Sequence, residues 1–136
     1  MKPADRIRAY YEALNSGDAD LVASHFTEDA THFYTRLGPH EGGRAIAENA
    51  VWAVEQINGR WHLEHLVAGD EEAAIEWSMT WRDPKSGESR INRGAELFRF
   101  RDGLICEVRA YHHGDPRNPQ GDLLGFNFAE RGYTVL

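Results

Sequence analysis

Acid–base catalysis is the chemistry that the polar side chains of this sequence suit best. His32 lies in a β-favouring segment, and histidine is the side chain suited to accept or release a proton under physiological conditions. Glu96 lies among apolar residues, where an inward-facing carboxyl group is either protonated, as a hydrogen-bond donor, or paired with Arg93 or Arg109. Tyr10 falls on the apolar face of a predicted helix. Each of the three is also explained as a core residue whose polar atoms are satisfied by neighbours.

A metal centre is not expected from the histidines and the single cysteine. His112 and His113 are adjacent on a predicted strand and point to opposite faces, so they cannot bind one ion together. His62 and His65 also differ in strand parity. Cys106 is the only cysteine, which excludes both a thiolate cluster and an internal disulfide.

Three helices are predicted in the first half of the chain. The first is expected from Pro3 to Asn15, where apolar side chains recur at helical spacing. Asp18 is a suitable N-cap for a short helix that ends near Phe26, because its carboxylate can accept hydrogen bonds from the free amides of the first turn. A third helix is expected from Arg44 to Ile57, before the helix-ending pair Asn58-Gly59.

Strands make up most of the second half. One strand, Ala30 to Arg36, is predicted among the helices, with His32 and Tyr34 on one face. Four more alternate with turn sequences that favour hairpins, at Trp61 to Val67, Ala73 to Arg82, Arg90 to Arg101 and Leu104 to His112. Helices followed by an antiparallel sheet predict an α+β fold.

The composition predicts one folded, soluble domain spanning residues 1–136. A net charge of −7 without a basic stripe argues against nucleic-acid binding. No apolar stretch approaches the roughly 20 residues that cross a membrane, and no apolar signal region is present, so a cytoplasmic protein is expected. Residues 114–136 are too apolar for a solvated linker, and we expect this tail to pack on a pocket mouth or a dimer partner.

Three stretches of the chain resemble a known family. They are Tyr10 to Asp18, Phe26 to Tyr34 and the strand–turn–strand sequence Gly94 to Ile105. Together they are similar to the family that contains nuclear transport factor 2, the SnoaL-like polyketide cyclases and ketosteroid isomerase, over roughly Tyr10 to His113. The resemblance implies a cone-shaped fold, in which three N-terminal helices and a curved antiparallel sheet enclose one deep apolar pocket.

Within this family, ketosteroid isomerase offers the closest functional comparison. Its oxyanion tyrosine falls on Tyr10 and its second donor, a buried carboxylic acid, falls on Glu96. Its general-base aspartate falls on Tyr34, which holds its proton until about pH 10, so steroid isomerisation itself is not predicted. His32 lies two residues earlier on the same strand face, and we infer that it supplies the base instead.

The predicted function is cofactor-free isomerisation, cyclisation or dehydration of a small apolar molecule, with no metal or organic cofactor. His32 would act as base while Tyr10 and Glu96 polarise an oxygen atom. The pocket that holds the ligand would be lined by Tyr34, Trp52, Phe98 and His112, together with aromatic side chains of the sheet. His112 is included because its parity resembles that of the family's cavity-lining positions.

Two alternatives and one partner complete the hypothesis. The domain could instead bind a small ligand or a partner without catalysis, since fold does not fix function. The second alternative is epoxide hydrolysis, which in this family needs an arginine between two carboxylates. The candidates are Arg93, Glu96, Arg109 and Glu76. A homodimer through the outer face of the sheet is expected to cover the apolar side of the strand that carries Trp77, Met79 and Trp81.

Overall fold

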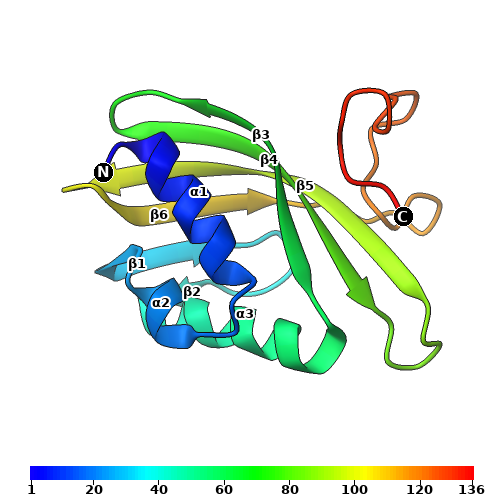
Figure 1. Ribbon diagram of the computed structural model, residues 1–136, viewed down its shortest axis with the longest axis horizontal. Coiled ribbons are helices and arrows are strands. Elements are labelled where there is room, and N and C mark those ends of the chain that lie inside the picture. Colours follow the sequence, from blue (N-terminus) through cyan, green and yellow to red (C-terminus); the bar gives the residue numbers. More distant parts are fainter.

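The computed structural model describes residues 1–136 and has an α+β architecture with one six-stranded sheet (Figure 1). Its strand order is β2-β1-β6-β5-β4-β3. The elements in chain order are α1 (Pro3–Leu14), α2 (Ala19–Ala23), β1 (Phe26–Phe33), β2 (His40–Glu41), α3 (Gly43–Ile57), β3 (Arg60–Ala68), β4 (Glu72–Arg82), β5 (Ser89–Arg101) and β6 (Leu104–Tyr111).

The helices begin and end where local chemistry favours it. Pro3 occupies the start of α1, where its missing N–H is not needed. Asp18 caps α2 by accepting hydrogen bonds from the amides of Asp20 and Leu21 at 3.0 and 3.1 Å. The helix α2 is shorter than predicted, because the chain already enters β1 at Phe26. At the end of α3, Asn58 adopts the left-handed conformation with φ of 52°.

The sheet differs from the predicted arrangement at its β1 edge. Strand β1 begins four residues before the predicted start at Ala30, and Tyr34 follows its last residue. It pairs with β6 in parallel, with His32 opposite Val108, whereas all other neighbouring strands are antiparallel. The two-residue strand β2, which the sequence does not predict, pairs with β1. The sheet, which was predicted to be antiparallel, therefore contains one parallel strand pair at this edge.

The two faces of the sheet have different chemistry. The inner face carries Ile75, Trp77 and Met79 of β4, and the helices lie against it (Figure 1). The outer face carries the alternate residues of β4, including Ser78, and Arg93 of β5. The apolar side of β4 is therefore covered within the subunit, and not by a partner as the sequence analysis assumed.

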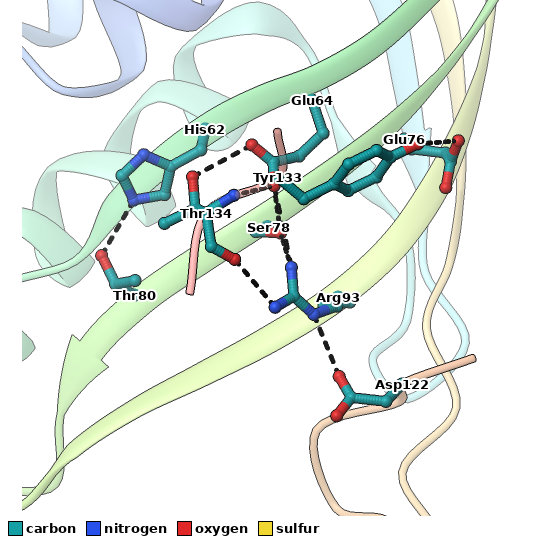
Figure 2. Close-up of polar contacts among 9 residues, drawn as sticks. All are labelled: His62, Glu64, Glu76, Ser78, Thr80, Arg93, Asp122, Tyr133 and Thr134. Carbon is teal, nitrogen blue, oxygen red and sulfur yellow. Dashed lines mark hydrogen bonds and ion pairs between the residues drawn. The ribbon is translucent and has the colours of Figure 1, made fainter. Parts of the chain in front are cut away.

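The C-terminal tail after β6 lies on the outer face of its own sheet. The backbone N–H of Arg93 donates to the carbonyl of Gln120 at 2.8 Å, and the N–H of Thr134 donates to Glu64 at 2.7 Å. Tyr133 donates its hydroxyl hydrogen to Glu76 at 2.6 Å (Figure 2). None of the helices is long and apolar enough to span a bilayer.

Candidate active site

A buried carboxyl group on the inner face of the sheet is the centre of the candidate site. Strand β5 places Glu96 between Ile75 of β4 and Ala110 of β6, and only 6% of this residue is exposed. Tyr11 of α1 donates its hydroxyl hydrogen to Oε1 of Glu96. Nε2 of His32 lies 3.2 Å from Oε2 of the same carboxyl group. Glu96, Tyr11 and His32 therefore form one buried cluster, which joins the helical layer to two strands.

The partners of Glu96 are a hydroxyl and an imidazole, and no arginine or lysine contacts it. Burial, followed by the charge of Glu96, raises the pKa of Tyr11 well above 10, so Tyr11 keeps its proton and donates. When Glu96 is a carboxylate, it accepts a hydrogen bond from Nε2–H of His32. Nδ1 of a neutral His32 is then an acceptor, and it is buried without a hydrogen-bond partner.

Ring contacts hold His32 in this orientation. Its imidazole stacks on the ring of Tyr34, with centroids 4.0 Å apart and an interplanar angle of 11°. The ring of His40 lies edge-on to the ring of Tyr34, with centroids 5.0 Å apart. Burial and the nearby His32 lower the pKa of His40. The shared face that the sequence analysis assigned to His32 and Tyr34 is present, and Tyr34 supports the histidine.

Tyr10 lies beside the cluster without bonding to it. Its ring packs against Phe26 and Phe98, with centroids 5.1 and 6.3 Å apart. Its hydroxyl forms no hydrogen bond within the protein, and Tyr11 is the tyrosine that bonds Glu96. Burial, and then the charge of Glu96, raises the pKa of Tyr10. Tyr10, the predicted oxygen-polarising donor, is therefore not the tyrosine that contacts Glu96.

The cluster forms part of the wall of a cavity of about 360 Å³ between the helices and the sheet. Tyr10, Tyr34, Trp52 and His112 line this cavity, as the sequence analysis expects. Phe98, which was also expected there, does not line it and instead packs in the core against Tyr10. The remaining apolar lining comes from helix and sheet residues such as Leu14, Ile46, Ile57, Trp61, Trp77 and Met79. Such a lining suits a small molecule with an apolar body.

A larger, shallower depression elsewhere lacks this chemistry. It measures about 1330 Å³ and lies around Met1, Asp70 and Arg101. Neither Glu96 nor His32 lines it, so the smaller cavity is the better candidate site.

Of the residues considered for epoxide hydrolysis, only Glu96 lines the cavity. Arg93 lies on the outer face, with its Nε 3.0 Å from Asp122 and its Nη1 3.7 Å from Glu64 (Figure 2). Glu76 also lies on that face, and Arg109 pairs with its strand neighbour Glu107 at 2.7 Å. No three His, Cys, Asp or Glu side chains are grouped to hold a metal ion.

Sequence reasoning missed Tyr11, Asn49 and Asn92 as cavity residues. The helical spacing contains a signal for Tyr11, because Tyr10 and Tyr11 both lie on the apolar face that Ile7 begins. Spacing alone does not decide which of two adjacent tyrosines faces the carboxyl group. Asn49 and Asn92 carry no such signal.

The fold is shared with proteins of known structure. A protein of unknown function with a cystatin-like fold from Methylobium petroleophilum is 32% identical, with a TM-score of 0.72, and the match covers 98% of this chain and 91% of that one. A candidate polyketide cyclase from Xanthomonas campestris is 22% identical, with a TM-score of 0.72 over 88% of this chain and 96% of that one. The epoxide hydrolase/cyclase-like enzyme SalBIII is 22% identical, with a TM-score of 0.69, and the match covers 81% of this chain and 89% of that one.

No protein of curated function matches the chain. The SnoaL-like domain family matches residues 7–108, which include most of α1, the β1 histidine and the β5 carboxyl group. Because this match spans most of the chain, the protein belongs to the SnoaL-like domain family.

Proposed function

We propose that the protein is a cofactor-independent acid–base enzyme that isomerises, cyclises or dehydrates a small, largely apolar molecule. One observation carries the proposal: Glu96 is buried in the wall of an apolar cavity and is held by Tyr11 and His32, two groups that can keep or move a proton. Burying a carboxyl group without a cationic partner is costly, and costly groups of this kind are concentrated at functional sites.

The proposed roles follow from the contacts. His32 accepts a proton from the substrate at Nδ1, while Glu96 holds its Nε2–H and stabilises the imidazolium that forms. Tyr11 fixes Glu96 from the helical side. Tyr10, which lines the cavity with an unbonded hydroxyl, donates a hydrogen bond to the substrate oxygen on which negative charge develops. Glu96 thus acts through His32 and not directly as an oxygen-polarising donor.

The structural neighbours support this class of reaction. Several are named as candidate polyketide cyclases, and one is epoxide hydrolase/cyclase-like. Epoxide hydrolysis is less favoured for this chain, because Arg93 lies on the opposite face of the sheet from Glu96. The alternative is a non-catalytic domain that uses the same cavity only to bind a small ligand or a partner.

Ligand screening followed by kinetics distinguishes catalysis from binding. Small ketones, phenols and polyketide-like compounds are first tested for an increase in melting temperature, because a ligand of the native state stabilises it. Compounds that bind are then followed for turnover. His32→Gln and Glu96→Gln should each reduce turnover by about a hundredfold or more, while Arg90→Met should leave it unchanged. Ligand binding without turnover in the wild type would favour the binding domain.

We also propose that the protein acts in the cytoplasm as a homodimer. The tail already covers Ser78 and Arg93 on the outer face, so a dimer would use exposed apolar residues of the tail itself, Leu123 and Leu124, together with Tyr111 of β6. Light scattering coupled to size-exclusion chromatography measures the mass in solution directly. A monomeric mass at micromolar concentration would overturn this part of the proposal.

A further inference from the structure

A second polar point in the cavity wall is His112, which follows β6. Its Nδ1 lies 2.6 Å from the carbonyl oxygen of Arg93. A carbonyl oxygen can only accept, so Nδ1 of His112 carries the hydrogen atom and donates it. In the neutral ring, Nε2 is then an acceptor with a free lone pair. Nε2 is buried and has no hydrogen-bond partner in the protein, although His112 lines the cavity.

The C-terminal tail fixes His112 in this orientation from the outer side of the sheet. The backbone N–H of Arg93 is held by the carbonyl of Gln120. Gly121 follows with φ of 76°, and a Cβ atom there would lie 3.2 Å from Nδ1 and Cε1 of His112. The tail therefore leaves the imidazole little freedom to turn its unbonded nitrogen away from the cavity.

Trp77 adds a second unbonded polar atom at the same place. Its ring centroid lies 5.9 Å from that of His112, and both residues line the cavity. The indole Nε1–H is also buried without a partner. A donor and an acceptor side by side are complementary to a hydroxyl group, which can accept from one and donate to the other. Leaving both unsatisfied would cost about 1 to 3 kcal/mol for each group.

We infer that the cavity selects molecules that carry a second polar group, a hydroxyl or N–H, which donates a hydrogen bond to Nε2 of His112. This inference rests on the proposed function, since the first polar group is the one that meets His32 and Tyr10. In the β5–β6 ladder, Glu96 lies opposite Ala110, two residues before His112. Two residues along the strand and one strand across separate the backbone of Glu96, which His32 contacts, from that of His112 by roughly 8 Å. The ligand is therefore a small apolar body with polar groups at both ends.

Three naphthalene derivatives test this inference by calorimetry. The probes 2,6-dihydroxynaphthalene, 6-methoxy-2-naphthol and 2-naphthol share one ring system and one hydroxyl, and differ only at the far end. The wild type should bind the dihydroxy probe about tenfold more tightly than the methoxy probe, the usual effect of one buried hydrogen bond. In His112→Phe, this ratio should fall to about one.

Two glycine variants keep the test independent of the histidine substitution. Gly121→Ala should also reduce the ratio, because the new Cβ displaces the imidazole. Gly125→Ala is the matched control, since Gly125 has a similar φ of 83° but nothing within 4 Å of the added atom. Gly125→Ala should keep the ratio of the two affinities, although it introduces the same backbone strain at a positive φ as Gly121→Ala.

The outcomes separate this inference from the proposed function. Equal binding of the dihydroxy and methoxy probes by the wild type, no binding of any probe, or a tenfold ratio that survives in His112→Phe would each overturn it. Glu96→Gln should abolish turnover but keep the preference for the dihydroxy probe. If the protein binds the probes with this preference but turns over no substrate, the inference about His112 holds and the proposed catalytic function is wrong.

Discussion

Two buried carboxylates on opposite faces of one sheet are stabilised in different ways. On the outer face, Glu64 belongs to a cluster centred on the guanidinium of Arg93, which also contacts Asp122, the Ser78 hydroxyl and the carbonyl of Thr134 (Figure 2). The ring of Phe128 stacks 3.8 Å from this guanidinium. The outer cluster has a permanent cation, each of whose three nitrogen atoms donates a hydrogen bond.

On the inner face, Glu96 has no cation and depends on the hydroxyl of Tyr11 and the imidazole of His32. An arginine cannot release its proton in a protein, whereas a histidine can. The outer cluster therefore anchors the tail, and the inner cluster is able to exchange protons with a molecule in the cavity. Burial of charge alone does not identify a reactive site; the identity of the partner does.

The largest expected effect is on stability and concerns the outer cluster. Arg93→Met removes the cation and leaves Glu64 buried and unpaired, so the free energy of unfolding should fall by about 3 to 5 kcal/mol. Urea denaturation measures this change. The control is Arg90→Met on the same strand, whose ion pairs with Asp83 and Glu88 are exposed, and it should cost no more than about 1 kcal/mol. Equal losses in the two variants would remove the distinction between a buried and an exposed arginine.

A smaller effect is expected from two adjacent tyrosines on the inner side. Tyr11→Phe removes a hydrogen bond to a buried carboxyl group and should lower the free energy of unfolding by about 2 kcal/mol. Tyr10→Phe loses no hydrogen bond within the protein and should change it by less than about 0.5 kcal/mol. The same denaturation experiment compares them. A larger loss of stability in Tyr10→Phe than in Tyr11→Phe would show that Tyr11 is not the tyrosine that stabilises Glu96.

The smallest effect concerns the tail at alkaline pH. Partial burial and the hydrogen bond to Glu76 raise the pKa of Tyr133 to about 12, above its unfolded value near 10. The folded state thus holds this proton more tightly, so the stabilisation is complete below pH 10 and is lost as the pH rises through 12. Wild type and Tyr133→Phe should differ by less than about 1 kcal/mol at pH 8, and this difference should shrink between about pH 10 and 12. A difference that stays constant over this range would exclude the linkage.

The sequence predicts most elements because their signals are local. Helices α1 and α3 and strands β3 to β6 begin and end within one residue of the predicted positions, where apolar periodicity and turn residues coincide. The parallel pairing of β1 with β6 depends on contacts between distant segments, which periodicity does not contain.

The candidate site is predictable in part for the same reason. Strand parity and the family resemblance together place His32, Glu96 and His112 on the cavity face. The choice of Tyr11 over Tyr10 depends on how α1 is rotated against the sheet, and the position of the tail depends on side-chain pairing with Arg93. Neither property is encoded in the spacing of residues along one element.

Hydrogen exchange of a simple ketone tests the central claim, that the inner cluster can move a proton, most directly. The small two-ring ketone 2-tetralone has acidic protons next to its carbonyl group, and NMR follows their replacement by deuterium in D₂O. The wild type should accelerate this exchange, His32→Gln should reduce the acceleration by about a hundredfold, and Arg90→Met should retain it. Exchange at the uncatalysed rate in the wild type, or at an equal rate in His32→Gln, would contradict the account.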